Sequence, residues 1–118
     1  MKYLEQIGFD IGFKNKHRDN AYLIAALYGQ IEIMKYLEEK DFDIRIKNNY
    51  GNDAYLLASW KGQLSVIQYL YLIGFDINTT NNDGNNAYLM AVYNTQIEVM
   101  KYLKEECFRL SNVYIKSN

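Results

Sequence analysis

The chain has 118 residues, a formal net charge of −1, a single cysteine and no proline. This length suits one folded unit, and a charge so close to zero argues against strong electrostatic attraction to nucleic acid or to an anionic membrane. A lone cysteine excludes an intrachain disulfide and places a four-ligand zinc site out of reach.

Nothing in the sequence suggests insertion into a membrane or export. No apolar run approaches the ~20 residues of a membrane span, and the first residues lack a basic segment followed by an apolar one. We therefore expect an intracellular, cytoplasmic protein with no membrane and no nucleic-acid partner.

Residues 1–14 are the first element of a pattern that returns every 33 residues. Within them, 1–12 hold only a second helix and its exit loop, and complete units follow at 15–47, 48–80 and 81–110, before a tail at 111–118. Three blocks keep this phase: Asn/Asp-Ala-Tyr-Leu from residues 20, 53 and 86; Met/Ile-Lys/Gln-Tyr-Leu from 1, 34, 67 and 100; and Phe-Asp-Ile or Phe-Arg-Leu from 9, 42, 75 and 108. Blocks in constant phase indicate one supersecondary unit copied several times.

The unit 15–47 begins its first helix after Asn20, which stands where an N-cap belongs, and Gly29 ends that helix. The unit 48–80 shows the pattern most fully. Turn-forming residues fill 48–52, with Gly51 at a position that suits positive φ. Asp53 then caps a helix over 54–60, which Gly62 ends.

A second helix is predicted over 63–72, because its apolar positions 66, 67, 70 and 71 have helical spacing. Gly74 ends it, and 75–78 leads extended into the next turn. The unit 81–110 repeats this order from the cap Asn86. Neither helix buries its apolar face alone, so we expect the units to stack, with close contacts between first helices through Ala21, Ala25, Ala54, Ala58, Ala87 and Ala91.

These residues resemble the ankyrin repeat, a unit of 33 residues whose usual pattern is Gly-x-Thr-Pro-Leu-His-x-Ala-Ala, Gly-His-x-Glu-Val-Val, a Leu-Leu pair and Gly-Ala-Asp-Val-Asn. Residues 51–59, 62–67 and 74–78 take these places in one unit, and Gly84, Ala91, 98–100 and Leu103 do so in the next. The resemblance covers residues 1–110. It implies an all-α ankyrin-repeat α-solenoid, with helix-turn-helix units joined by β-turn and extended loops in a single domain over 1–118.

The chain departs from that pattern at two kinds of position. Asn/Asp-Ala-Tyr-Leu replaces Thr-Pro-Leu-His in every copy, so the hydroxyls of Tyr22, Tyr55 and Tyr88 are candidates to replace the family's histidine network. Glycine is also replaced at four positions, where we expect strained or irregular turns: Arg18, Asp41, Thr95 and Cys107.

No residue set predicts catalysis or a cofactor. His17, the only histidine, has no neighbouring ligand and is expected to be a surface contact residue. Cys107 follows two glutamates, which would raise the pKa of its thiol, so a structural role is favoured over a nucleophile. Residues 78–84 superficially resemble a calcium loop, but Met90 occupies the position that requires glutamate. The repeated tyrosines and methionines at positions 3, 36, 69, 102, 34 and 100 are interpreted as packing residues.

The resemblance implies a non-enzymatic protein-interaction module that binds a protein partner on its concave face. The turn-tip positions that would contact this partner are Lys16, His17, Asp19, Asn49, Tyr50, Asn52, Asn82, Asp83 and Asn85, and the helix-face positions are Leu27, Tyr28, Trp60, Lys61, Tyr93 and Asn94. Leu27, Trp60 and Tyr93 share one slot in successive units and are expected to form an apolar-aromatic stripe. The simpler interpretation is that the turns cover this stripe and it only packs.

A structural alternative is self-association, or membership of a longer array of which this chain is a fragment. Residues 1–7 would expose a helix edge with Met1, Leu4 and Ile7, which would ordinarily pack on a preceding unit. Such an edge would pair with another copy of the chain or with missing repeats.

Overall fold

A computed structural model describes residues 20–116, with side chains described as far as Glu106. Its helices are α2 (Ala21–Leu27), α3 (Ile31–Glu39), α4 (Ala54–Lys61), α5 (Leu64–Leu72), α6 (Ala87–Tyr93) and α7 (Ile97–Lys116), and no strand occurs among these residues. The predicted all-α class is confirmed. Predictions made for the Met1, Leu4 and Ile7 edge, and for Lys16, His17, Arg18 and Asp19, lie outside the described residues.

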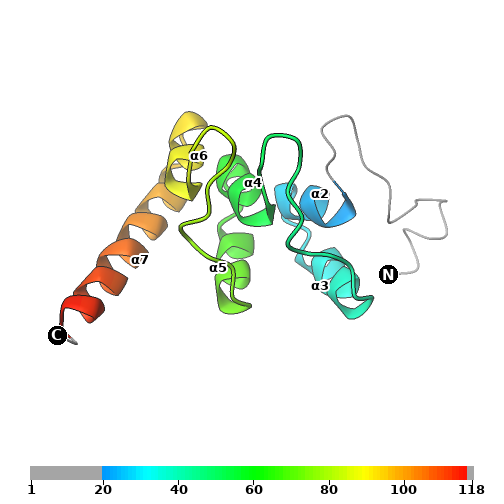
Figure 1. Ribbon diagram of the computed structural model, residues 1–118, viewed down its shortest axis with the longest axis horizontal. Helices are drawn as coiled ribbons and strands as arrows, with labels where there is room; N and C mark the ends of the chain where they lie inside the picture. Colours follow the sequence, from blue (N-terminus) through cyan, green and yellow to red (C-terminus); the bar gives the residue numbers. More distant parts are fainter. Residues whose placement is uncertain (1–19, 117–118) are drawn as a thin grey trace.

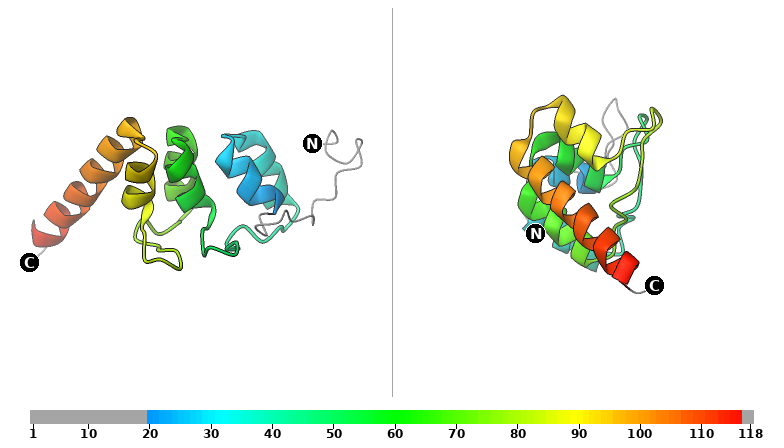
Figure 2. Two further views of the ribbon diagram at one scale, coloured as in Figure 1. Left: turned by 90° about the horizontal axis from the view of Figure 1, so that it is seen from above. Right: turned by 90° about the vertical axis from the view of Figure 1, so that its left-hand side faces the viewer.

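The six helices form three pairs that stack side by side (Figure 1). The first helices α2, α4 and α6 make one layer, with α4 in contact with both neighbours, and α3, α5 and α7 make the other. Long loops leave α3 and α5 and return along one edge of the stack, as the two further views show (Figure 2). The molecule is elongated, with principal extents of 52 × 27 × 22 Å, as expected for a solenoid of stacked units.

Each first helix begins at the cap that the sequence predicts. The side chains of Asn20, Asp53 and Asn86 accept hydrogen bonds of 3.0 Å from the backbone N–H groups three residues on, those of Leu23, Leu56 and Leu89. These bonds satisfy N–H groups that have no partner within the helix. The short helices are therefore fixed at their start before any packing is considered.

The core lies between the two layers and between adjacent pairs. The six alanines predicted to make these contacts are at most 4% exposed, and the first helices lie in contact, which confirms the predicted close approach of α2, α4 and α6. Larger side chains from the second helices fill the remaining space, and those that are buried are Met34, Leu37, Val66, Ile67, Leu70, Val99 and Leu103.

One of the three tyrosines considered as replacements for the family's histidine network donates a hydrogen bond from its hydroxyl. The Tyr22 hydroxyl donates to Glu38 Oε2 at 2.8 Å, and the Tyr69 hydroxyl donates to Glu38 Oε1 at 2.6 Å. Burial, and then the bond to Glu38, raise the pKa of both hydroxyls, so they stay protonated as donors. Glu38 thus joins α2, α3 and α5, while the equivalent role of Tyr55 and Tyr88 stays a prediction.

Consecutive pairs are also joined at the ends of their first helices. Gln63 Nε2 donates to the Leu27 carbonyl at 3.1 Å, and 33 residues later Gln96 Nε2 donates to the Trp60 carbonyl at 3.1 Å. Gly62 adopts φ +79° against Gln96, and a Cβ there would collide with the Gln96 amide. Glycine suits this position because of its positive φ, and because a Cβ would force the Gln96 amide out of its place.

Two of the replaced glycines confirm the expected irregular turns. Asp41 and Thr95 have φ values of 58° and 54°, in the left-handed region that non-glycine residues seldom adopt. The prediction for Cys107 is wrong, because α7 continues through it to Lys116 and no turn forms there. The sequence before Cys107, Leu103-Lys104-Glu105-Glu106, contains only good helix formers, so the helix does not stop.

Candidate functional site

Two asparagines build the turn tips beside the first helices. Asn48 Oδ1 accepts from the backbone N–H groups of Tyr50 and Asn52 at 3.0 Å each, and the Asn48 N–H donates to the Asn52 carbonyl at 3.0 Å. Asn81 repeats this arrangement with Asp83 and Asn85 at the same distances. An asparagine whose side chain accepts from the following backbone fixes a turn locally, so the two tips are copies of one structure.

The two tips are also bonded to each other. Asn82 Nδ2 donates to the Asn49 carbonyl and the Asn82 N–H donates to the Tyr50 carbonyl, both at 2.9 Å. Asn81 Nδ2 donates to Asn52 Oδ1 at 3.0 Å. The tips therefore form a continuous wall along the open side of α4 and α6.

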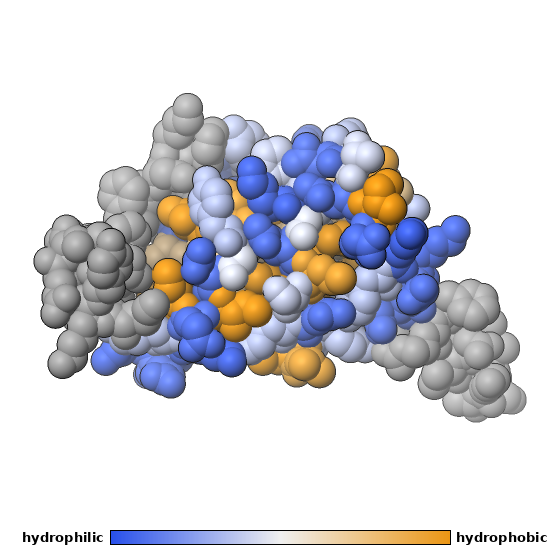
Figure 3. Space-filling view, turned by 180° about the vertical axis from the view of Figure 1, so that it is seen from behind, coloured by the Kyte–Doolittle hydropathy of each residue, from blue (hydrophilic) through white to orange (hydrophobic). Residues whose placement is uncertain are grey.

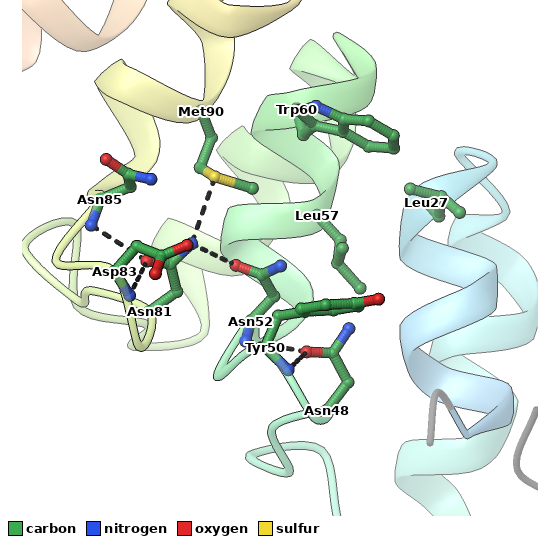
Figure 4. A pocket seen from close by; sticks show the side chains of 10 residues that line it. All are labelled: Leu27, Asn48, Tyr50, Asn52, Leu57, Trp60, Asn81, Asp83, Asn85 and Met90. Carbon is green, nitrogen blue, oxygen red and sulfur yellow. Dashed lines mark hydrogen bonds between the residues drawn. The ribbon is translucent and has the colours of Figure 1, made fainter. Parts of the chain in front are cut away.

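Between this wall and the first helices lies a cavity of about 460 Å³, which we call the concave groove. Figure 4 shows its lining, with Leu57, Trp60 and Met90 on the helices α4 and α6, Leu27 on α2, and the tip residues opposite. The full lining is Leu27, Asn48, Tyr50, Asn52, Leu57, Trp60, Asn81, Asp83, Asn85 and Met90. The groove has an apolar floor and a polar rim, the usual character of a ligand site.

Six of the residues predicted to contact a partner are brought together in the concave groove. These are Leu27, Tyr50, Asn52, Trp60, Asp83 and Asn85. The predicted stripe is therefore only partly assembled, because Leu27 and Trp60 line the groove while Tyr93, 68% exposed, does not.

The remaining predicted residues lie around the groove. Lys61 holds its Nζ atom 6.0 Å from the ring centroids of both Tyr28 and Trp60. Asn94 Nδ2 donates to the Trp60 carbonyl at 2.9 Å. Asn49 and Asn82 form the hydrogen bond that joins the two tips. They therefore hold the lining residues in place but do not line the groove themselves.

Four lining residues were missed by the sequence reasoning: Asn48, Leu57, Asn81 and Met90. Leu57 precedes Trp60 by three residues, as Met90 precedes Tyr93, and this spacing places each pair on one helical face. The signal for Asn48 and Asn81 was their shared place three residues before Gly51 and Gly84. Both signals were present, but Leu57 was predicted only as part of a helix, Met90 was considered only as a calcium-loop position, and the two asparagines were interpreted as ordinary turn residues.

Burial gives the carboxyl group at the start of α4 a pH-dependent effect. Asp53 is buried, and desolvation raises the pKa of its carboxyl above the ordinary value. The folded state therefore binds this proton more tightly than the unfolded chain, and its contribution to stability falls as pH rises through the raised pKa.

At pH 7, the free energy of unfolding of Asp53→Asn should therefore equal or exceed that of the unmodified chain, since asparagine caps a helix equally well. The advantage should vanish below the ordinary carboxyl pKa of about 3.9, as urea titrations at several pH values would measure. Asp53→Ala removes the cap and should lose about 0.5–2 kcal/mol. The measured quantity is the difference in unfolding free energy between Asp53→Asn and the unmodified chain. If this difference favoured the variant more at pH 3.5 than at pH 7, desolvation of the Asp53 carboxylate would not be the cause.

The described part of the chain brings no three His, Cys, Asp or Glu side chains together as a metal site. None of its helices combines the length and apolar character that crossing a membrane requires.

The family model for ankyrin repeats (3 copies) matches residues 1–81. No curated protein matches the chain.

Proposed function

Since the chain belongs to the ankyrin repeat family, whose members are generally protein-interaction modules, we propose that it binds a protein partner in the concave groove. The observation that supports this most directly is the groove itself, in which exposed aromatic rings stand over a buried apolar floor. Trp60 is 37% exposed and Tyr50 53%, whereas Leu57 and Met90 beneath them are 6% and 7% exposed. Aromatic residues at such a place are typical binding hot spots.

The groove is also held in shape before any partner arrives. The Trp60 carbonyl accepts from both Asn94 and Gln96, and the wall of tips carries its own hydrogen bonds. A preformed site loses less conformational freedom on binding. Rigid aromatic side chains on a fixed backbone therefore favour recognition by this surface.

Exposed apolar residues occur elsewhere, so exposure alone does not select the groove. Leu72 is 81% exposed, and the view from behind shows apolar patches broken up by hydrophilic residues (Figure 3). The groove differs because it is hollowed and combines an apolar floor with a polar rim. We propose further that the module is a non-enzymatic, intracellular single domain with units at 15–47, 48–80 and 81–110, and that the predicted positions around the groove, among them Tyr28, Lys61 and Tyr93, extend the contact.

Trp60→Ala should strongly weaken partner binding. The experiment is affinity capture from cell lysate with the unmodified chain, Trp60→Ala and Leu72→Ala, followed by calorimetry with the purified partner. Loss of a hot-spot aromatic should weaken binding about 30-fold or more, while Leu72→Ala, which removes an exposed apolar side chain from the other layer, should bind normally.

Circular dichroism and thermal unfolding would verify that both variants fold. A partner captured equally by Trp60→Ala and by the unmodified chain would overturn the groove as the binding site. If Leu4→Lys abolished the association instead, binding would belong to the N-terminal edge predicted over residues 1–7.

A further inference from the structure

We propose that the concave groove selects a short linear segment in which a basic side chain lies close to an apolar one. The apolar side chain would enter between Tyr50 and Trp60, and the basic group would pair with Asp83. This inference rests on the proposed function and adds the chemistry of the partner. It follows from the size of the groove, from its floor and from the charge on its rim.

The size of the groove favours a segment over the face of a folded domain. A volume of about 460 Å³ falls within the range of small-ligand pockets, about 300–1,000 Å³. It therefore accommodates a few side chains. A folded partner that docked broadly would need about 800 Å² on each side, which such a cavity alone does not provide.

The floor and walls favour an apolar anchor on that segment. Leu57 and Met90 are almost completely buried below the opening, and Leu27 closes one end. The Trp60 and Tyr50 rings stand apart at the two sides of the opening (Figure 4). An aliphatic or aromatic side chain placed between the two rings would be shielded from water on all sides. Removing apolar surface from water is favourable by roughly 25 cal/mol per Å².

The rim supplies one charge, and it is negative. Asp83 is the only charged residue among those that line the groove, and its carboxylate makes no hydrogen bond or ion pair with any described residue. Lys47 and Lys61 make other contacts: Lys47 Nζ donates to the Thr80 carbonyl at 3.2 Å, and Lys61 Nζ lies 6.0 Å from the ring centroids of Tyr28 and Trp60. A carboxylate beside an apolar wall attracts a cation and repels an anion.

A neutral donor completes the rim. Because Asn52 Oδ1 accepts from Asn81, the Asn52 amide nitrogen is turned the other way, toward Leu57 (Figure 4). Asn81 Nδ2 is already occupied, by Asn52 and by Met90 Sδ at 3.5 Å. Asn52 Nδ2 is thus placed to donate to a backbone carbonyl of the bound segment, which would fix the segment between the floor and Asp83.

The test is selection from a phage-displayed library of random 12-residue peptides on the full chain, with the enriched peptides then synthesised and measured by fluorescence polarisation. We expect enriched sequences to place Lys or Arg within a few residues of a large apolar residue. Asp83→Asn should weaken these peptides about 5- to 30-fold, and raising NaCl from about 50 to 500 mM should weaken binding to the unmodified chain much more than to Asp83→Asn.

Two further variants sharpen the result. Asp83→Lys should shift the enriched sequences toward Asp and Glu, because the rim charge is reversed. Glu98→Gln changes the net charge as much as Asp83→Asn, but at an exposed position of α7 outside the lining, and should leave the peptide affinities unchanged. Asp83 contributes its backbone N–H to the turn, so its side-chain variants keep the tip intact, as circular dichroism would verify.

The outcomes separate this inference from the proposed function. If Trp60→Ala abolishes peptide binding while both Asp83 variants leave affinity and enriched sequences unchanged, the basic preference is wrong and the groove still binds. If no peptide is enriched over a blank surface, the partner is not a short linear segment. The proposed function would still be supported if a folded partner were captured by the unmodified chain and not by Trp60→Ala. If peptides bind equally to Trp60→Ala, both proposals fail.

Discussion

Leu56→Ala should lower the free energy of unfolding by about 2–5 kcal/mol, the range for truncation of a buried leucine. Leu56 is fully buried in α4, the helix that contacts α2 on one side and α6 on the other. Alanine would leave a cavity at the centre of a stack with three helix pairs, about the smallest stable number of repeats. Urea unfolding followed by circular dichroism measures the loss.

The chain contains its own control for this variant. Leu89 occupies the same slot in α6, after the cap Asn86, but it is 41% exposed. Leu89→Ala removes the same atoms from a half-covered site that water can refill, and should lose less than about 2 kcal/mol, the lower end of the range for a buried leucine. Equal losses for the two variants would mean that α4 and α6 are buried alike, against the structure.

Gly62→Ala should lower the free energy of unfolding by about 2–5 kcal/mol, the sum of a backbone cost and a steric cost. The alanine would have to adopt the left-handed backbone of Gly62, with φ +79°, at about 1–2 kcal/mol. Its Cβ would also collide with the Gln96 amide, which adds about 1–3 kcal/mol of overpacking or loses the bond to the Trp60 carbonyl. Thermal and urea unfolding would measure the sum.

Gly84 separates the two effects, because it also has φ +79° but a Cβ there would meet nothing within 4 Å. Gly84→Ala should therefore show the backbone cost alone, about 1–2 kcal/mol. Adding Gln96→Ala to Gly62→Ala should recover part of the loss, since the collision is removed. A double variant no more stable than Gly62→Ala would assign the whole effect to the backbone.

The local signals of this sequence carried most of the fold. Asn20, Asp53 and Asn86 cap helices as predicted, because capping depends on a side chain and on backbone groups only a few residues away. Gly51 has the expected positive φ, since a four-residue turn is equally local. The 33-residue period and its phase predicted the place of every described helix pair, because caps and turns recur at the same positions of each unit.

The errors come from features that the repeat does not determine. Extending the phase to Cys107 predicted a turn, but the residues there favour helix, and local propensity decided the outcome in α7. The groove could not be predicted from the 33-residue repeat, because the repeat does not show how deep a side chain lies below the surface. Leu57 and Met90 are buried by neighbouring residues and still form the floor of an open cavity, and a pattern of apolar positions cannot distinguish such a floor from a closed core.

The bonds that join consecutive helix pairs also have an order in time. At the helix ends, the acceptor belongs to the earlier pair and the donor to the later one: the Leu27 carbonyl is synthesised 36 residues before the Gln63 that binds it, and the Trp60 carbonyl 36 residues before Gln96. At 5–20 residues per second, a ribosome takes about 2–7 s to add that length. Helices form in about a microsecond, so formation of these bonds is limited by the synthesis of the later residue and not by helix formation. Because about three repeats are needed for a stable stack, the earlier carbonyls wait for their glutamine donors, and the stack becomes stable only as the later pairs are added.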